Sequence, residues 1–124
     1  MLVAEDNDEI RNLLASILVT GGFDVNLARN GAEALSLCED GLVVDLLITD
    51  LMMPQMGGVE LARRLRRIQP EVGTVFVSGH PLEKANLPEL DAKREAYLAK
   101  PFTPAQLRQE VHRALANSRP TPAE

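Results

Sequence analysis

The sequence predicts a single α/β domain in which helices cover both faces of a parallel sheet. Five apolar runs of strand length alternate with segments of helical period along the 124 residues, a pattern typical of repeated strand–helix–strand units. One of these runs is almost continuously apolar, as expected for a central strand that is buried on both faces. The five predicted strands cover residues 1–4, 23–27, 43–49, 74–77 and 96–99.

The first predicted helix has an apolar stripe and a distinct end. Apolar side chains recur at three- and four-residue spacing, which places them on one face of a helix. Gly21 and Gly22 end the stripe, because glycine commonly terminates helices. Taken singly, Asp6 or Asp8 could be no more than a cap at the start of this helix. The stripe consists of Ile10, Leu13, Leu14, Ile17 and Leu18.

Two further helices begin with capping motifs. Asn30 is followed three residues later by Glu33, which predicts the start of a second, short helix;. Thr103, Pro104 and Gln106 give the corresponding signal before the last helix, with proline at the first helical position;. The expected buried stripe of the last helix is Leu107, Val111, Ala114 and Leu115.

The remaining helices are specified unequally. An apolar stripe predicts a third helix that ends before Pro70;. Between residues 79 and 95, two prolines bracket a polar stretch, so the fourth helix is expected to be short or irregular;. We expect the folded domain to cover residues 1–116 and residues 117–124 to form a disordered tail or linker. The stripe of the third helix is Leu61, Ala62, Leu65 and Ile68.

Polar side chains that can share one site follow three of the predicted strands. Glu5 and Asp6 come after the first strand, Asp50 after the third and Lys100 after the fifth. If these strands are parallel neighbours, the side chains gather at one edge of the sheet, where open α/β folds bind ligands. Three close carboxylates repel one another, so one of them takes a proton or a divalent cation lies between them. Mg²⁺ fits best, because it accepts a few carboxylate oxygens and keeps positions for water and a phosphoryl group.

Such a site is suited to metal-assisted phosphoryl chemistry. Asp50 is the candidate nucleophile, since a carboxylate can attack phosphorus and form an acyl phosphate when the charge is neutralised. Glu5 and Asp6 are candidate metal ligands, joined by Asp50 and the backbone carbonyl of Met52. Lys100 is expected to contact the phosphoryl group, and to pair with Asp50 when that group is absent.

Five short motifs lie around the ends of the predicted strands and in the loop before the third helix. They are Glu5-Asp6, Asp50-Leu51-Met52-Met53-Pro54, Gly57-Gly58, Ser78-Gly79 and Tyr97-Leu98-Ala99-Lys100-Pro101-Phe102. Their residue types and spacing resemble the receiver domain of two-component response regulators. The resemblance covers residues 1 to about 116. Receivers at the end of hybrid histidine kinases often share the Ser-Gly and Lys-Pro-Phe-Thr-Pro motifs.

The resemblance implies a fold and a chemical role for the acids. The fold would be flavodoxin-like, with five parallel strands in the order 2-1-3-4-5. Asp50 would take a phosphoryl group from a histidine kinase, with Mg²⁺ on Glu5, Asp6 and Asp50. The family commonly has Asp-Asp as its acid pair, so Glu5 is expected to reach the metal through a different arrangement of waters.

The resemblance also implies a conformational switch. Ser78 and Lys100 would sense the acyl phosphate, and the Ser78 hydroxyl would contact a phosphoryl oxygen. Tyr97 matches the switch aromatic of the family, which turns inward as Ser78 moves. The altered surface would then bind a downstream effector protein.

Composition disfavours several other functions. A net charge of −5 disfavours direct nucleic-acid binding;, and the run Arg63, Arg64, Arg66 and Arg67 is expected to be a solvated helix face. No apolar run approaches the roughly 18 residues needed to span a bilayer, and no signal peptide is visible. We therefore expect a cytoplasmic domain without membrane contact. One cysteine, Cys38, excludes an internal disulfide;.

The leading hypothesis is a signalling module that performs only self-catalysed transfer and slow autodephosphorylation, and is not otherwise an enzyme. A pseudo-receiver, which binds proteins without phosphorylation, is an alternative that loss of Asp50 or Lys100 would have favoured. A phosphatase with an aspartyl intermediate usually needs a second acid where Met52 stands. A flavin carrier is disfavoured because Glu5 and Asp6 would repel the flavin phosphate. The sequence leaves open a stand-alone receiver, a relay protein and a domain of a hybrid kinase.

Overall fold

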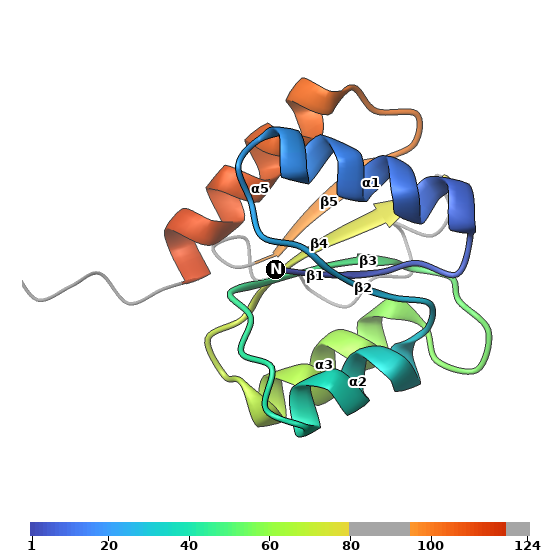
Figure 1. The fold of residues 1–124 in the computed structure, drawn as a ribbon, viewed down its shortest axis with the longest axis vertical. Coiled ribbons are helices and arrows are strands. Elements are labelled where there is room, and N and C mark those ends of the chain that lie inside the picture. The colour runs from blue at the N-terminus through green and yellow to red at the C-terminus, as the bar shows by residue number, and fades with distance from the viewer. Residues whose placement is uncertain (80–94, 119–124) are drawn as a thin grey trace, which may run out of the picture.

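The computed structural model describes residues 1–79 and 95–118, so the predicted fourth helix and residues 119–124 of the predicted tail lie outside the described residues. Five strands form one sheet, with α1 and α5 on one face and α2 and α3 on the other (Figure 1). Helix α5 continues two residues past the expected domain boundary at 116. The elements are β1 (Leu2–Ala4), α1 (Asp8–Thr20), β2 (Asn26–Ala28), α2 (Gly31–Glu39), β3 (Leu46–Asp50), α3 (Gly58–Ile68), β4 (Gly73–Ser78), β5 (Glu95–Ala99) and α5 (Pro104–Ser118).

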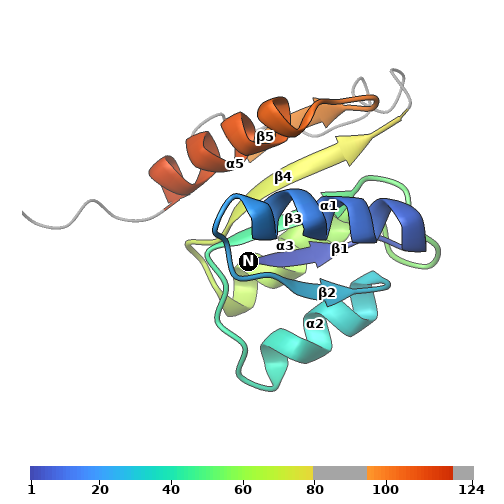
Figure 2. The same cartoon turned by 45° about the horizontal axis from the view of Figure 1, so that its top comes forward.

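The sheet is parallel throughout, and its strand order β2-β1-β3-β4-β5 confirms the predicted fold (Figure 2). The register pairs Ala4 with Thr49, and it pairs Ser78 with Ala99. Strands β1, β3, β4 and β5 therefore end close to one line across the sheet. Polar residues that follow these strands consequently meet at a single edge.

Alternating side chains of the strands divide the core into two layers. Leu46 and Ile48 face the layer beneath α1 and α5, whereas Leu47 faces the layer beneath α2 and α3. All three are fully buried, and each such side chain contributes about 1.5–3 kcal/mol of transfer free energy;. The central strands are thus held from both faces, which fixes the position of the residues at their ends.

The cap of α1 is Asn7. Its Oδ1 accepts a hydrogen bond from the N–H of Ile10 at 3.0 Å, so the alternative interpretation of Asp6 or Asp8 as the cap of this helix does not apply. Asn7 has the extended backbone that a cap requires and lies three residues before the N–H that it binds;. Asp8 is instead the first residue of the helix.

The two predicted capping motifs are confirmed. Asn30 Oδ1 accepts from the N–H of Glu33 at 2.8 Å, and Glu33 Oε1 in turn accepts from the N–H of Arg29 at 3.1 Å. At α5, Thr103 Oγ1 accepts from the N–H of Gln106 at 3.1 Å, while Gln106 Oε1 accepts from the N–H of Thr103 at 2.8 Å. Both helices thus begin where the sequence indicates.

Some expected core and strand residues lie outside the core or the sheet. Leu13 is 54% exposed, because it lies at the edge of the stripe that Leu14, Ile17 and Leu18 form on α1. Ile68, the last residue of α3, is 40% exposed. Strands β2 and β3 each begin three residues later than expected. Within the described part of the chain, no helix has the length and apolar character needed to cross a membrane.

Candidate functional site

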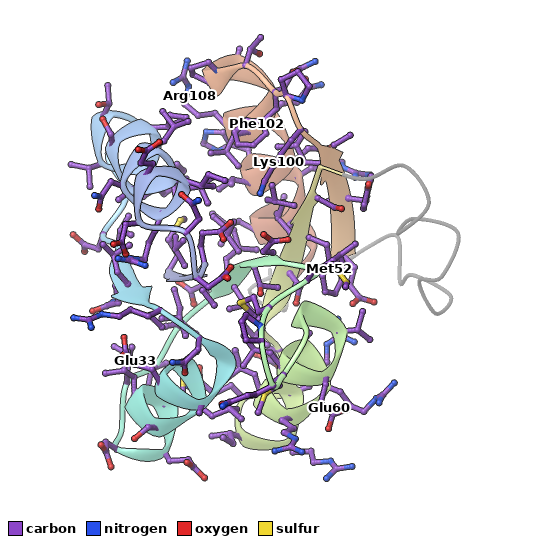
Figure 3. All side chains as sticks on the ribbon, turned by 90° about the vertical axis from the view of Figure 1, so that its right-hand side faces the viewer. Glu33, Met52, Glu60, Lys100, Phe102 and Arg108 are labelled. Atoms are coloured by element: carbon purple, nitrogen blue, oxygen red, sulfur yellow. The ribbon has the colours of Figure 1, made fainter. Side chains whose placement is uncertain are left out.

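The carboxyl ends of the strands carry the residues that the sequence motifs identify. Figure 3 looks onto this edge and labels Lys100, directly after β5, and Met52, in the loop after β3. Glu5 directly follows β1, Asp50 is the last residue of β3, and Ser78 is the last residue of β4. The strand order places these ends next to one another, as predicted.

Lys100 contacts two of the carboxylates. Its Nζ lies 3.3 Å from Asp50 Oδ2 and 3.5 Å from Glu5 Oε1. The Lys100, Asp50 and Glu5 side chains are 21, 13 and 1% exposed, respectively, so solvent screens these interactions less than it screens a surface ion pair. The ammonium group therefore offsets part of the repulsion between the two acids.

Burial sets the protonation of Glu5. It raises the pKa of the Glu5 carboxyl from 4.5 to about 7; the charge of Asp50 and a hydrogen bond with Asp6 also raise it. The N–H of Asn7, which donates to Glu5 Oε2 at 3.1 Å, and the Lys100 ammonium lower this pKa, but not enough to offset burial. Near neutral pH the carboxyl holds a proton part of the time, which is one of the two ways to relieve crowded carboxylates.

A divalent cation is the other way to relieve the repulsion between the three carboxylates, and their geometry suits one. One carboxylate oxygen from each of Glu5, Asp6 and Asp50 lies within 4.8 Å of the other two. Two ligands of one Mg²⁺ lie at most about 4.2 Å apart, because each is about 2.1 Å from the ion. A small inward movement of the side chains would bring all three oxygens within this span, and a water between one carboxylate and the ion would serve equally. Since Asp6 is exposed to solvent, a bound ion could keep several waters, as Mg²⁺ prefers.

The loop after β3 holds the backbone of Asp50 against the start of α3. The N–H of Met52 donates to Asp50 Oδ1 at 3.2 Å, and the N–H of Gly58 donates to the carbonyl of Leu51 at 2.9 Å. A Cβ at Gly58 would lie 2.3 Å from the carbonyl oxygen of Asp50, which is too close for any side chain. Glycine at this position thus allows α3 to approach the candidate nucleophile. The Met52 side chain is 65% exposed beside it.

Ser78 and Tyr97 lie on the same face of the sheet. Ser78 is fully buried, and its carbonyl accepts a hydrogen bond from the N–H of Lys100 at 2.7 Å. Tyr97 pairs with Phe76 in the register and packs, half-buried, against the core layer beneath α2 and α3. Since Ser78 is two residues after Phe76, its side chain projects from that same face.

Two residues that support the acid pair were not predicted as part of the site. Asn7 binds the Glu5 carboxylate through its N–H, and Arg11 Nη1 donates to the carbonyl oxygen of Glu5 at 3.0 Å. Asn7 is of a residue type that often caps helices, but its neighbours Asp6 and Asp8 give the same signal in the sequence. Arg11 gives no such signal, because a single arginine on a helix usually lies on the solvated face.

A cavity of about 420 Å³ lies away from the carboxylates, between α3 and β5, and none of the predicted site residues lines it. One of its arginines departs from the expected solvated face, because Arg66 is 30% exposed and pairs with Glu95 at 2.9 Å. Arg63 and Arg64 follow the expectation, since both are about half exposed and pair with Glu60 on their own helix. The cavity is lined by Val59, Ala62, Arg63, Arg66, Arg67, Phe76 and Glu95.

Comparison with known proteins decides the family. The family model of the response regulator receiver domain matches residues 1–112. The chain belongs to this family. It is 37% identical over 116 residues to the response regulator receiver protein CpdR of Brucella abortus, a match that covers 93% of this chain and 95% of CpdR.

Further relatives confirm the predicted resemblance. The sensor kinase CckA of Brucella abortus is 38% identical over 118 residues, a match that covers 93% of this receiver but 12% of the kinase. The crystal structure of a response regulator receiver protein from Sinorhizobium medicae superposes with a TM-score of 0.84 at 33% identity, covering 95% of this chain and 94% of that one. The receiver family includes both small proteins and parts of large kinases, and this receiver resembles members of each kind.

Proposed function

We propose that Asp50 accepts a phosphoryl group from the phosphohistidine of a histidine kinase or a phosphotransfer protein. The observation that carries this proposal is the 3.3 Å contact between Lys100 Nζ and Asp50 Oδ2, at a strand edge that also holds the carboxylates of Glu5 and Asp6. A carboxylate that an ammonium group contacts, beside two further acids that can hold a metal ion, can receive a phosphoryl group, because both cations would stabilise the charge of the phosphoryl oxygens.

In the proposed transfer, an Asp50 oxygen forms a bond to phosphorus while the phosphorus–nitrogen bond of the phosphohistidine breaks. The electron pair of the broken bond stays on the imidazole nitrogen, and Asp50 becomes an acyl phosphate. Lys100 would move its contact from the carboxylate to a phosphoryl oxygen. Mg²⁺, held by Glu5, Asp6, Asp50 and the carbonyl of Met52, would supply positive charge to the phosphoryl oxygens.

The same proposal gives Ser78 and Tyr97 the role of a switch. The Ser78 hydroxyl would donate to a phosphoryl oxygen, and Tyr97 would turn into space that the shift of Ser78 opens. Their common face of the sheet supports this coupling, since both project toward the side of α3. The changed surface would select a downstream effector protein, so the receiver acts by changing its partners.

The proposal also covers the extent of the signalling domain and the kind of protein that contains it. Residues 1–116 would form the signalling unit, with the residues after them as a tail or linker. The match to nearly all of CpdR supports a stand-alone receiver, and the match to a part of CckA supports a domain of a hybrid kinase. In either arrangement the partners would be a phosphohistidine donor and an effector protein.

The test is intact-protein mass spectrometry after incubation with acetyl phosphate and Mg²⁺. We expect a gain of one phosphoryl group that disappears in Asp50→Asn and in EDTA. Asp40→Asn, which neutralises an exposed acid at the end of α2, should be phosphorylated as the wild type is. A second arm replaces acetyl phosphate by a phosphorylated histidine kinase domain. No gain with either donor would contradict the proposal and favour a pseudo-receiver.

A further inference from the structure

We propose that Arg11 is a positioning residue for the metal site, an inference that rests on the proposed function and deepens it. Arg11 Nη1 donates to the backbone carbonyl of Glu5 at 3.0 Å, and Nη2 donates to Asp8 Oδ1. Glu5 and Asp8 lie on either side of Asp6 in the sequence. One guanidinium group therefore bridges both ends of the short segment that carries two of the proposed metal ligands.

The carbonyl of Glu5 lies where strand pairing ends. The paired register of β1 stops at Ala4 toward both β2 and β3, although the N–H of Glu5 still donates to the carbonyl of Ala28 at 3.1 Å. Arg11 donates to the carbonyl on the other side of the same residue. Its side chain is only 12% exposed, and a hydrogen bond from a charged donor that is sheltered from water is stronger than a neutral one.

The backbone position of this segment decides where the Glu5 carboxylate lies. The N–H of Asn7 donates to Glu5 Oε2 at 3.1 Å, so the carboxylate follows the main chain of the segment. Asn7 is in turn held by α1, because its carbonyl accepts from the N–H of Arg11 at 2.9 Å. Mg²⁺ demands near-ideal octahedral geometry, so a small displacement of this segment would weaken its binding.

Arg11 acts through geometry more than through charge. Its guanidinium forms an ion pair with Asp8, so a partner on the solvent side balances the positive charge. Its hydrogen bond within the site goes to a backbone carbonyl, and not to a carboxylate that would bind the metal. Arg11→Lys keeps the charge but loses the planar fork that reaches two acceptors at once, and it should therefore weaken the site as well.

The test measures Mg²⁺ affinity by isothermal titration calorimetry on the full chain. Arg11→Met should weaken Mg²⁺ binding by about tenfold and Arg11→Lys by at least about threefold, in line with the loss of groups that orient metal ligands. Asn30→Ala is the matched control, because it removes the cap of α2 without touching the acid pair. Urea unfolding in EDTA reports the loss of stability of each variant separately.

A merely structural role predicts a different result. If Asn30→Ala, at similar stability, loses as much Mg²⁺ affinity as the Arg11 variants, or if the Arg11 variants bind Mg²⁺ as the wild type does, the inference is overturned. Should Arg11→Met not fold, Arg11→Lys decides. A wild type that binds Mg²⁺ but is not phosphorylated contradicts the proposed function alone. A wild type that binds no Mg²⁺ overturns both.

Discussion

Replacing Glu5 by glutamine should stabilise the metal-free protein at alkaline pH. Burial is the largest cause that raises the pKa of this carboxyl from 4.5 to about 7. Ionising Glu5 therefore costs about 3 kcal/mol more in the folded protein than in the unfolded chain;. Because the pKa rises on folding, the folded state holds more protons between these values. The stability from protonated Glu5 is therefore fully present below pH 4.5 and is lost as the pH rises through 7;.

Glutamine removes this pH-dependent loss but also removes an attraction. Its amide oxygen can still accept from the N–H of Asn7, whereas the 3.5 Å ion pair with Lys100 disappears. We expect Glu5→Gln to raise the free energy of unfolding by about 1–3 kcal/mol at pH 8. At pH 5, where wild-type Glu5 is largely protonated in the folded state, this gain should be about 2 kcal/mol smaller.

Urea unfolding in EDTA at pH 5 and pH 8 measures this difference. Glu39→Gln is the control for the loss of one negative charge, because Glu39 is an exposed residue at the end of α2, and its effect should be small at both pH values. A Glu5→Gln variant that is no more stable than the wild type at pH 8, or a gain in stability that does not depend on pH, would contradict this expectation.

Three further substitutions test the site and the elements that position its residues. Lys100→Met should lower the free energy of unfolding in EDTA by about 1–3 kcal/mol, because it leaves two poorly exposed carboxylates without their cation;. The same variant should bind Mg²⁺ a few-fold more tightly in calorimetry, and weaker Mg²⁺ binding would contradict the expectation. Gly58→Ala should slow phosphorylation by acetyl phosphate about tenfold or more, since its Cβ would collide with the Asp50 carbonyl;, and an unchanged rate would show that the loop adapts. Thr103→Ala should cost about 1 kcal/mol in urea unfolding through the lost cap of α5;, with phosphorylation retained; a loss of phosphorylation would mean that this cap also positions Lys100.

The fold was predictable because its signals are local and repeated. The apolar run that contains β3 gave a central strand, and the Asn30 and Thr103 motifs gave the starts of α2 and α5. Parallel strands then place residues at their ends on one edge, which is why Glu5, Asp50 and Lys100 could be expected together. The strand order came from the resemblance to a known family, since strand periodicity alone does not select neighbours.

The details that the sequence missed depend on contacts between segments or on competition between neighbouring polar residues. Asn7, Asp6 and Asp8 are all acceptable caps by residue type, and only the backbone geometry selects Asn7. Arg11 belongs to the site because its side chain, on α1, donates to the carbonyl of Glu5 at the end of β1. The pKa of Glu5 likewise depends on burial beneath its neighbours, which composition does not reveal.

Asp50 is the residue proposed to carry the phosphoryl group, and an acyl phosphate can be located directly. After phosphorylation, borohydride reduction converts an acyl phosphate to the corresponding alcohol, and peptide mass spectrometry locates the reduced residue. We expect reduction at Asp50 in the presence of Mg²⁺ and at no other carboxylate. Reduction at Glu5 or Asp6, or a stable phosphate that borohydride does not reduce, would contradict it.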